Sequence, residues 1–117
     1  MTQFIKILHN PKCTKSRLTV KLLAEKGIQT NIVEYLKTPL VKQELEEILQ
    51  MLNLEPRQLM RTHESEYKDN ALDNETLSRD QLIDAMVKYP KLIERPIVIN
   101  NGKAAIGRPP ENVLEIL

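Results

Sequence analysis

The stretch FIKILHNPKCTKSR, residues 4–17, decides the fold. Its opening run, Phe4 to Leu8, is apolar except for Lys6 and predicts a short β-strand. Pro11 then interrupts regular structure, and the residues from Arg17 onward predict a helix. The only cysteine of the chain, Cys13, therefore lies in the connection between a strand and a helix.

The segments that follow extend this pattern to a β-α-β unit. The helix is predicted over residues 17–26, with Gly27 at its end and three inward-facing leucines, Leu18, Leu22 and Leu23. Residues 30–36, TNIVEYL, are rich in β-branched and aromatic side chains and predict a second strand. Two strands joined through a helix favour parallel pairing with a right-handed crossover.

The middle of the chain is predicted to be helical. Thr38 is a good N-cap and Pro39 suits the first helical position. The apolar residues after them recur at helical spacing: Val41, Leu45, Ile48, Leu49 and Leu52. Residues 55–61 predict another short helix, and residues 62–76 predict irregular chain or a short helix.

A further helix begins with a capping box. Ser78 and Gln81 have the spacing in which each side chain bonds the other residue's backbone N–H. The helix is predicted to run through Tyr89 and to end at Pro90, with Leu82, Ile83, Met86 and Val87 facing inward.

The C-terminal part predicts a hairpin and a closing helix. Residues 95–99 and 103–106 predict two strands, and Asn100-Asn101-Gly102 between them is a strong hairpin-turn signal. Residues 112–117 predict the last helix. The whole order predicts an α/β fold of thioredoxin-like layout: a mixed four-stranded sheet built from βαβ, a helical insertion and ββα, in one domain spanning residues 1–117.

Two consequences follow from that layout. The first strand–loop–helix connection, which contains Cys13, lies at the carboxyl end of its strand, where α/β sheets tend to place their ligands. Thioredoxin-like folds also place a cis-proline opposite the active cysteine, just before the third strand. The bond between Arg95 and Pro96 is therefore expected to be cis.

Composition narrows the class of protein. The chain has 117 residues and a formal net charge of +1, without a Lys/Arg-rich run, which argues against a nucleic-acid binder with a broad basic face. No signal-peptide pattern and no stretch near the roughly 20 apolar residues of a membrane span occur. We therefore expect a cytoplasmic protein, and a monomer because no long exposed apolar stripe is evident. A single cysteine cannot form an internal disulfide, and one cysteine with two separated histidines gives no metal-ligand spacing.

Cys13 is the candidate nucleophile. A thiol at a helix N-terminus faces unpaired backbone N–H groups and the positive end of the helix dipole, which favour the thiolate. Cys13-Thr14-Lys15-Ser16 has serine where a dithiol enzyme has its second cysteine, so an external thiol must resolve any intermediate. Ser16 is a candidate hydrogen-bond donor to the thiolate or to a bound anion. The alternative reading is a buried, inert cysteine.

The histidines and arginines are open to two readings. His9 either tunes Cys13 or is structural, and His63 is expected at the surface. Arg61, Arg95 and Arg108 occur beside residues that break secondary structure or at the ends of elements. They are candidates for an oxyanion site, because arginine offers fork-shaped donors that keep their charge. Taken singly, each is equally consistent with a solvated surface group.

Three motifs in order resemble a known family. HNPKCTKSR, ERPIVI and IGRPPE, together with LEPRQLMRTHESEY and LSRDQLIDAMVKYPKLI, are similar to the arsenate reductases that work with glutathione and glutaredoxin. The resemblance implies that Cys13 attacks arsenate and that Arg61, Arg95 and Arg108 bind the oxyanion. It also implies that His9 favours ionisation of the Cys13 thiol and that Ser16 supports Cys13. No cofactor is implied beyond glutathione as co-substrate, and the partners implied are arsenate, glutathione and glutaredoxin.

Two other functions remain open on the same fold. One is an RNA-polymerase-binding regulator, although such regulators often carry CxxC where this chain has CxxS, and they tend to lack the segment around Arg108. The other is a glutathione-dependent monothiol oxidoreductase that acts on protein mixed disulfides, for which three anion-binding arginines have no evident use.

Overall fold

The computed structural model describes residues 5–117, so Phe4 of the first predicted strand lies outside the described residues. The chain divides into two compact units, Met1–Thr38 with Arg95–Leu117, and Pro39–Glu94. No helix within residues 5–117 is long and apolar enough to cross a membrane.

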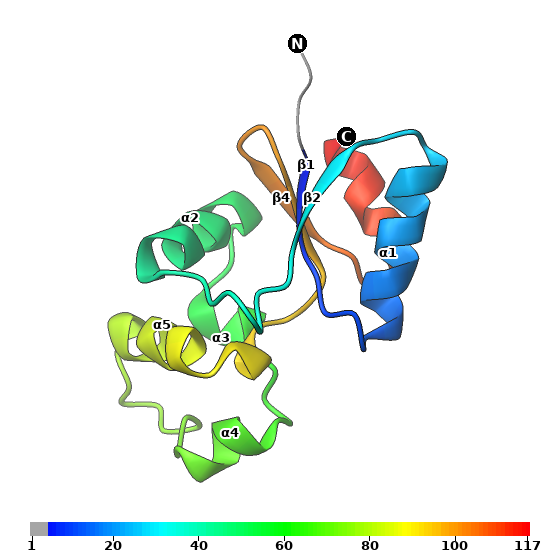
Figure 1. The fold of residues 1–117 in the computed structure, drawn as a ribbon. Coiled ribbons are helices and arrows are strands. Elements are labelled where there is room, and N and C mark those ends of the chain that lie inside the picture. The colour runs from blue at the N-terminus through cyan, green and yellow to red at the C-terminus, as the bar shows by residue number, and fades with distance from the viewer. Residues whose placement is uncertain (1–4) are drawn as a thin grey trace. The chain divides into compact units, whose positions relative to one another are not determined.

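The first unit contains the predicted mixed sheet (Figure 1). Its strands are β1 (Ile5–Leu8), β2 (Thr30–Val33), β3 (Ile97–Asn100) and β4 (Lys103–Ile106), in the spatial order β2-β1-β3-β4. β1 pairs with β2 in parallel and with β3 antiparallel, and β3 pairs with β4 antiparallel. This confirms the predicted α/β fold with a four-stranded mixed sheet.

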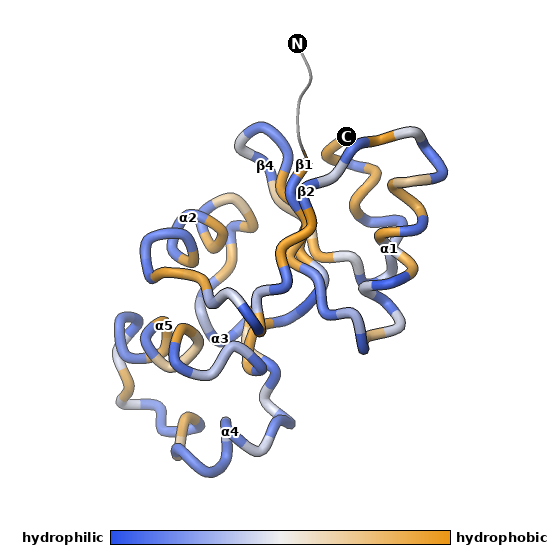
Figure 2. Tube along the Cα trace, viewed as in Figure 1, coloured by the Kyte–Doolittle hydropathy of each residue, from blue (hydrophilic) through white to orange (hydrophobic). Residues whose placement is uncertain are grey.

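Two helices pack beside this sheet. They are α1 (Thr14–Glu25) and the 3₁₀ helix η2 (Pro110–Ile116), which lie side by side in Figure 1 and contact each other. Hydrophobic residues gather along the strands in Figure 2, and alternate with hydrophilic ones along α1. Burial of one apolar face of each element forms the core, whose buried members are Ile5, Ile7, Leu23, Val98 and Val113.

The inward face of α1 differs from the prediction. The helix begins at Thr14, three residues before the predicted start, and its buried residues are Ser16, Thr19 and Leu23. Leu18 is 45 % exposed, so its predicted inward position is wrong. The two buried hydroxyls are hydrogen-bonded, Ser16 to the backbone of residue 10 and Thr19 to the carbonyl of residue 15, so small polar side chains can occupy this face.

The hairpin has the predicted turn. Asn101 and Gly102 both have positive φ, 51° and 79°, as a two-residue hairpin loop requires. β2 is shorter than predicted because residues 34–38 form a turn, in which the N–H of Thr38 bonds the carbonyl of Glu34 at 3.0 Å. The closing segment is a 3₁₀ helix that begins at Pro110, two residues before the predicted start of the helix.

The second unit is helical, with α2 (Lys42–Leu52), α3 (Pro56–Leu59), α4 (Ser65–Asp69), α5 (Arg79–Lys88) and the 3₁₀ helix η1 (Pro90–Leu92). The predicted capping box of α5 is confirmed, because Ser78 Oγ accepts from the N–H of Gln81 at 3.2 Å and Gln81 Oε1 accepts from the N–H of Ser78 at 2.8 Å.

The predicted start of α2 is wrong. Thr38 is held in the turn after β2, and the N-cap is Val41. The backbone N–H of Val41 donates to Glu44 Oε1 at 3.2 Å, so a glutamate in the first turn satisfies one of the exposed N–H groups that the cap leaves.

Candidate active site

The loop between β1 and α1 places Cys13 at the N-cap of α1, with φ −95° and ψ 124°. Asn10 shapes this loop from both sides. Its carbonyl accepts from the N–H of Cys13 at 3.0 Å, and its Oδ1 accepts from the N–H of Lys12 at 3.0 Å. An asparagine that folds back on the following backbone is the Asx-turn arrangement, which fixes the approach of the chain to the helix. Asn10 was not predicted as a site residue, although its place directly before Pro11 is a turn signal.

Ser16 connects this loop to a histidine. Ser16 Oγ accepts from the N–H of Asn10 at 3.0 Å and lies 2.6 Å from His9 Nδ1. Burial lowers the pKa of His9 and the nearby Arg17 charge lowers it further, while Glu34 acts in the opposite direction. A neutral imidazole can accept a hydrogen bond from the Ser16 hydroxyl at Nδ1, so these two residues stabilise the loop around the cysteine.

Two arginines converge near the sulfur. Arg108 Nη2 lies 3.5 Å from Cys13 Sγ, and Arg108 Nε donates to the carbonyl of Arg95 at 2.7 Å. Each arginine directly precedes a cis peptide bond, Arg95–Pro96 and Arg108–Pro109. The first of these confirms the expected cis-proline at Pro96, and the second was not predicted.

Gly107 makes this arrangement possible. Its N–H donates to the carbonyl of Pro96 at 2.9 Å, immediately before Arg108. A Cβ at this position would lie 2.6 Å from Thr19 Oγ1 and 2.8 Å from Pro96 Cγ, both far inside van der Waals contact. Glycine is therefore required where the end of β4 passes between α1 and the cis-proline. Neither Gly107 nor Thr19 was predicted as a site residue, because the role of each depends on contacts with residues distant in the chain.

The surroundings of Cys13 favour its thiolate. The thiol is 8 % exposed, and this burial alone raises its pKa. The backbone N–H of Ser16, a hydrogen bond from the Arg95 side chain, and the charges of Arg95 and Arg108 act in the opposite direction and are together stronger. The net pKa of Cys13 is lowered. Cys13 is thus buried but not in inert surroundings, since a thiolate is the nucleophilic form.

Arg61 lies in the second unit and forms ion pairs there. Backbone pairing brings its segment beside Glu94, since the N–H of Arg61 donates to the carbonyl of Leu92 at 2.7 Å. Its guanidinium then bonds Glu94 at 2.8 Å and Glu64 at 3.2 Å, and only 11 % of its side chain is exposed. His63 is exposed, as expected. The structure shows Arg61 engaged with two carboxylates, and its part in oxyanion binding stays a prediction.

The sequence matches the ArsC family over residues 8–116. The chain belongs to the ArsC family. A relative named arsenate reductase, from Neisseria meningitidis, is 48 % identical over 97 % of both chains. The uncharacterized protein YfgD of Escherichia coli is 52 % identical over 100 % of this chain and 99 % of its own. A solved structure, "Arsenate reductase from Vibrio cholerae", matches with a TM-score of 0.97 and 49 % identity, covering 100 % of both chains.

In this ArsC chain the first unit alone brings together six of the seven predicted site residues, Cys13, His9, Ser16, Arg95, Pro96 and Arg108. A thiolate beside two guanidinium groups has a definite chemical capacity. The sulfur supplies an electron pair, and the guanidinium N–H groups can hold the oxygens of a tetrahedral anion and stabilise the charge on it.

Proposed function

We propose that this protein reduces arsenate to arsenite, with Cys13 as the nucleophile and with Arg95 and Arg108 as ligands of the oxyanion. The observation that carries the proposal is the 3.5 Å approach of Arg108 Nη2 to Cys13 Sγ, because it puts an anion-binding group beside a nucleophile. The relatives named arsenate reductase support the choice of arsenate among oxyanions. We include Arg61 as a third oxyanion ligand on the resemblance of its motif.

The first step forms a bond between sulfur and arsenic. The Cys13 thiolate attacks arsenate, an arsenate oxygen leaves as water after taking up protons, and arsenic stays pentavalent in the Cys13–S–As adduct. Guanidinium groups stabilise the charge on the remaining oxygens. The lowered pKa of Cys13 raises the fraction of thiolate available at neutral pH.

The second part needs two external thiols, because the chain has one cysteine. Glutathione displaces a further oxygen from arsenic as water and forms an As–S bond. The thiol of glutaredoxin then attacks the glutathione sulfur, and the electron pair of that As–S bond passes to arsenic, which becomes trivalent. The products are a glutaredoxin–glutathione disulfide and a Cys13–As(III) species, and water releases arsenite and the free thiol from the latter.

This chemistry requires no bound cofactor, with glutathione acting as co-substrate. Because both external thiols must be kept reduced, we propose the cytoplasm as the compartment.

The test is arsenate-dependent NADPH oxidation, coupled through glutathione, glutaredoxin and glutathione reductase, with Cys13→Ser alongside. Turnover that requires arsenate, glutaredoxin and Cys13 is the expected result. Turnover retained in Cys13→Ser would exclude the proposed nucleophile. A folded protein with a reactive Cys13 and no arsenate turnover would exclude arsenate as substrate, and a glutathionylated protein would then be the next substrate to test.

A further inference from the structure

An open groove of about 400 Å³ lies between α1 and the start of η2, within the first unit. Five residues of α1 line it, Lys15, Leu18, Lys21, Leu22 and Glu25, together with Pro109, Pro110 and Glu111 at the start of η2. Lys15 is two positions after Cys13, and Pro109 directly follows Arg108. Two of the lining residues are therefore close in the chain to the thiol and to its guanidinium neighbour, which do not line the groove themselves.

The floor of the groove contains an apolar side chain that α1 leaves outside the core. The buried face of α1 carries Ser16, Thr19 and Leu23, which turns Leu18 outward to 45 % exposure. Leu18 lines the groove together with the exposed Pro109. The apolar floor suits the methylene and peptide portions of a small ligand.

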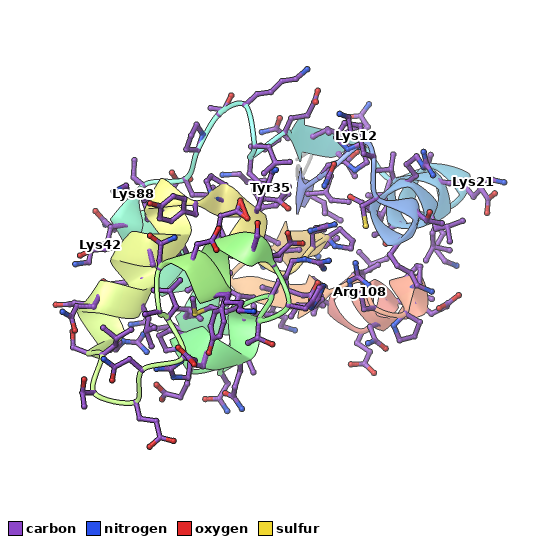
Figure 3. The ribbon with its side chains drawn as sticks, turned by 90° about the horizontal axis from the view of Figure 1, so that it is seen from below. Lys12, Lys21, Tyr35, Lys42, Lys88 and Arg108 are labelled. Carbon is purple, nitrogen blue, oxygen red and sulfur yellow. The ribbon has the colours of Figure 1, made fainter. Side chains whose placement is uncertain are left out.

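The charges around the groove are unevenly arranged. Along α1, Lys15, Arg17 and Lys21 all precede its first acidic residue, Glu25. Figure 3 shows Lys12 in the loop before α1 and Lys21 extending outward from that helix, with Arg108 near the start of η2. Lys21 approaches Glu25 at 4.0 Å, with 72 % and 60 % of the two side chains exposed. Because an exposed pair contributes little stability, a ligand carboxylate can replace Glu25 as the partner of Lys21 at little cost.

The proposed reaction consumes a second thiol, which a chain with a single cysteine cannot supply. The co-substrate that the groove would hold therefore carries a thiol. The volume is that of a small-molecule site, whereas a protein partner would cover about 800 Å² of surface. Two lysines fit two carboxylates, and Glu111, which also lines the groove, fits an ammonium group. Glutathione carries two carboxylates, one ammonium group and a central thiol.

We infer that the groove between α1 and the start of η2 binds glutathione, an inference that rests on the proposed function and assigns the place of its co-substrate. The dimensions agree. Cys13 and Lys21 are eight positions apart, about 12 Å along a helix. Lysine side chains lean toward the helix N-terminus, which brings the Lys21 ammonium closer to the thiol. A tripeptide spans about 10 Å, so its central thiol lies about 5 Å from each end, and the Lys21 side chain has to span the rest of the distance for the sulfur to reach the adduct while one terminal carboxylate reaches Lys21.

The experiment compares wild type, the double variant Lys15→Glu/Lys21→Glu and the control Lys26→Glu, an exposed charge reversal at the C-cap of α1 outside the groove. Initial rates give KM for glutathione at saturating arsenate and glutaredoxin, and KM for arsenate. We expect the double variant to raise KM for glutathione at least tenfold, with KM for arsenate unchanged, and Lys26→Glu to change neither. Unchanged KM for glutathione in the double variant would overturn the inference.

A second arm varies the ligand. Glutathione with both carboxylates esterified should have the raised KM already in wild type, and the double variant should not raise it further. Equal KM for glutathione and its diester in wild type would exclude recognition of the carboxylates.

A third arm separates this inference from the proposed function. Oxidised glutathione reacts with the Cys13 thiolate to give a Cys13–glutathione disulfide and one free glutathione thiolate, without arsenate. The double variant should slow this reaction about tenfold, and Lys26→Glu should not. If arsenate is not turned over, this rate still decides whether glutathione uses the groove, and equal rates in wild type and the double variant would reject it.

Discussion

Arg108 Nη2 lies 3.5 Å from Cys13 Sγ, while Nε of the same guanidinium is tied to the carbonyl of Arg95 at 2.7 Å. The backbone thus fixes Nε of the guanidinium, and Nη2 of the same group lies against the sulfur. A group held in this way is preorganised for charge that develops beside the sulfur.

Arg108→Lys should therefore lower kcat/KM for arsenate about 100-fold, the magnitude typical of losing one oxyanion donor. Lysine keeps the charge but cannot bond the Arg95 carbonyl and the anion through one planar fork. Steady-state kinetics check this, with Arg17→Lys, a nearby exposed arginine on α1, as the control. Equal losses in the two variants would contradict a specific role of Arg108.

The pH dependence of Cys13 alkylation provides a second prediction. The pKa of Cys13 is lowered, so the rate of reaction with iodoacetamide should rise with pH, with a midpoint below the ordinary thiol value of 9.0. Because the folded pKa lies below the unfolded one, the thiolate stabilises the fold above the unfolded pKa, and this stabilisation is lost as pH falls through the folded pKa. Arg95→Ala should move the alkylation midpoint upward, and a wild-type midpoint at or above the ordinary thiol value of 9.0 would refute the assignment.

The sequence predicted the residues of the site better than the residues that pack against them. Cys13 at a helix start follows from local order along the chain, the cis bond before Pro96 was expected from the thioredoxin-like layout, and the structure contains both. Gly107 and Thr19 could not be predicted, because their contact joins β4 to α1 across the fold. The predicted inward face of α1 was also wrong. The buried positions hold two hydroxyl side chains that bond the backbone, and Leu18 is exposed instead.

Gly107→Ala tests that missed contact. A methyl group 2.6 Å from Thr19 Oγ1 must displace the strand end that carries Arg108, so kcat/KM for arsenate should fall at least tenfold and the pKa of Cys13 should rise. Adding Thr19→Ala should restore part of the activity, because it removes the closest contact.

The control for this variant is Gly27→Ala, at a glycine with φ 71° and nothing within 4 Å of the added Cβ. It should lower stability by about 1 kcal/mol through backbone strain while leaving kcat/KM unchanged. If Gly107→Ala loses stability but keeps its activity and its Cys13 pKa, Gly107 is a structural residue only.

The partly buried ion pairs of Arg61 lead to a prediction about stability. Arg61→Met leaves Glu64 and Glu94 without the guanidinium that bonds them at 3.2 and 2.8 Å. The loss should be about 2 kcal/mol, or about 8 °C in Tm for a domain of this size. Arg79→Met is the matched control, because its pair with Glu55 at 3.4 Å is exposed and should contribute little. Thermal unfolding measures both, and similar shifts would contradict the ranking.

Acid should weaken the fold through His9. Its pKa is lowered by burial, so the folded state favours the neutral ring, whose Nδ1 lies 2.6 Å from Ser16 Oγ. A histidine with a folded pKa below its ordinary value of about 6.5 contributes stability that is present above 6.5 and is lost as pH falls through the folded pKa. His9→Gln cannot titrate, so Tm of wild type should fall more steeply than Tm of the variant on acidification from pH 6.5. Parallel Tm curves for the two proteins would show that the ring does not titrate with folding, and the loop around Cys13 would then depend on Ser16 and Asn10 alone.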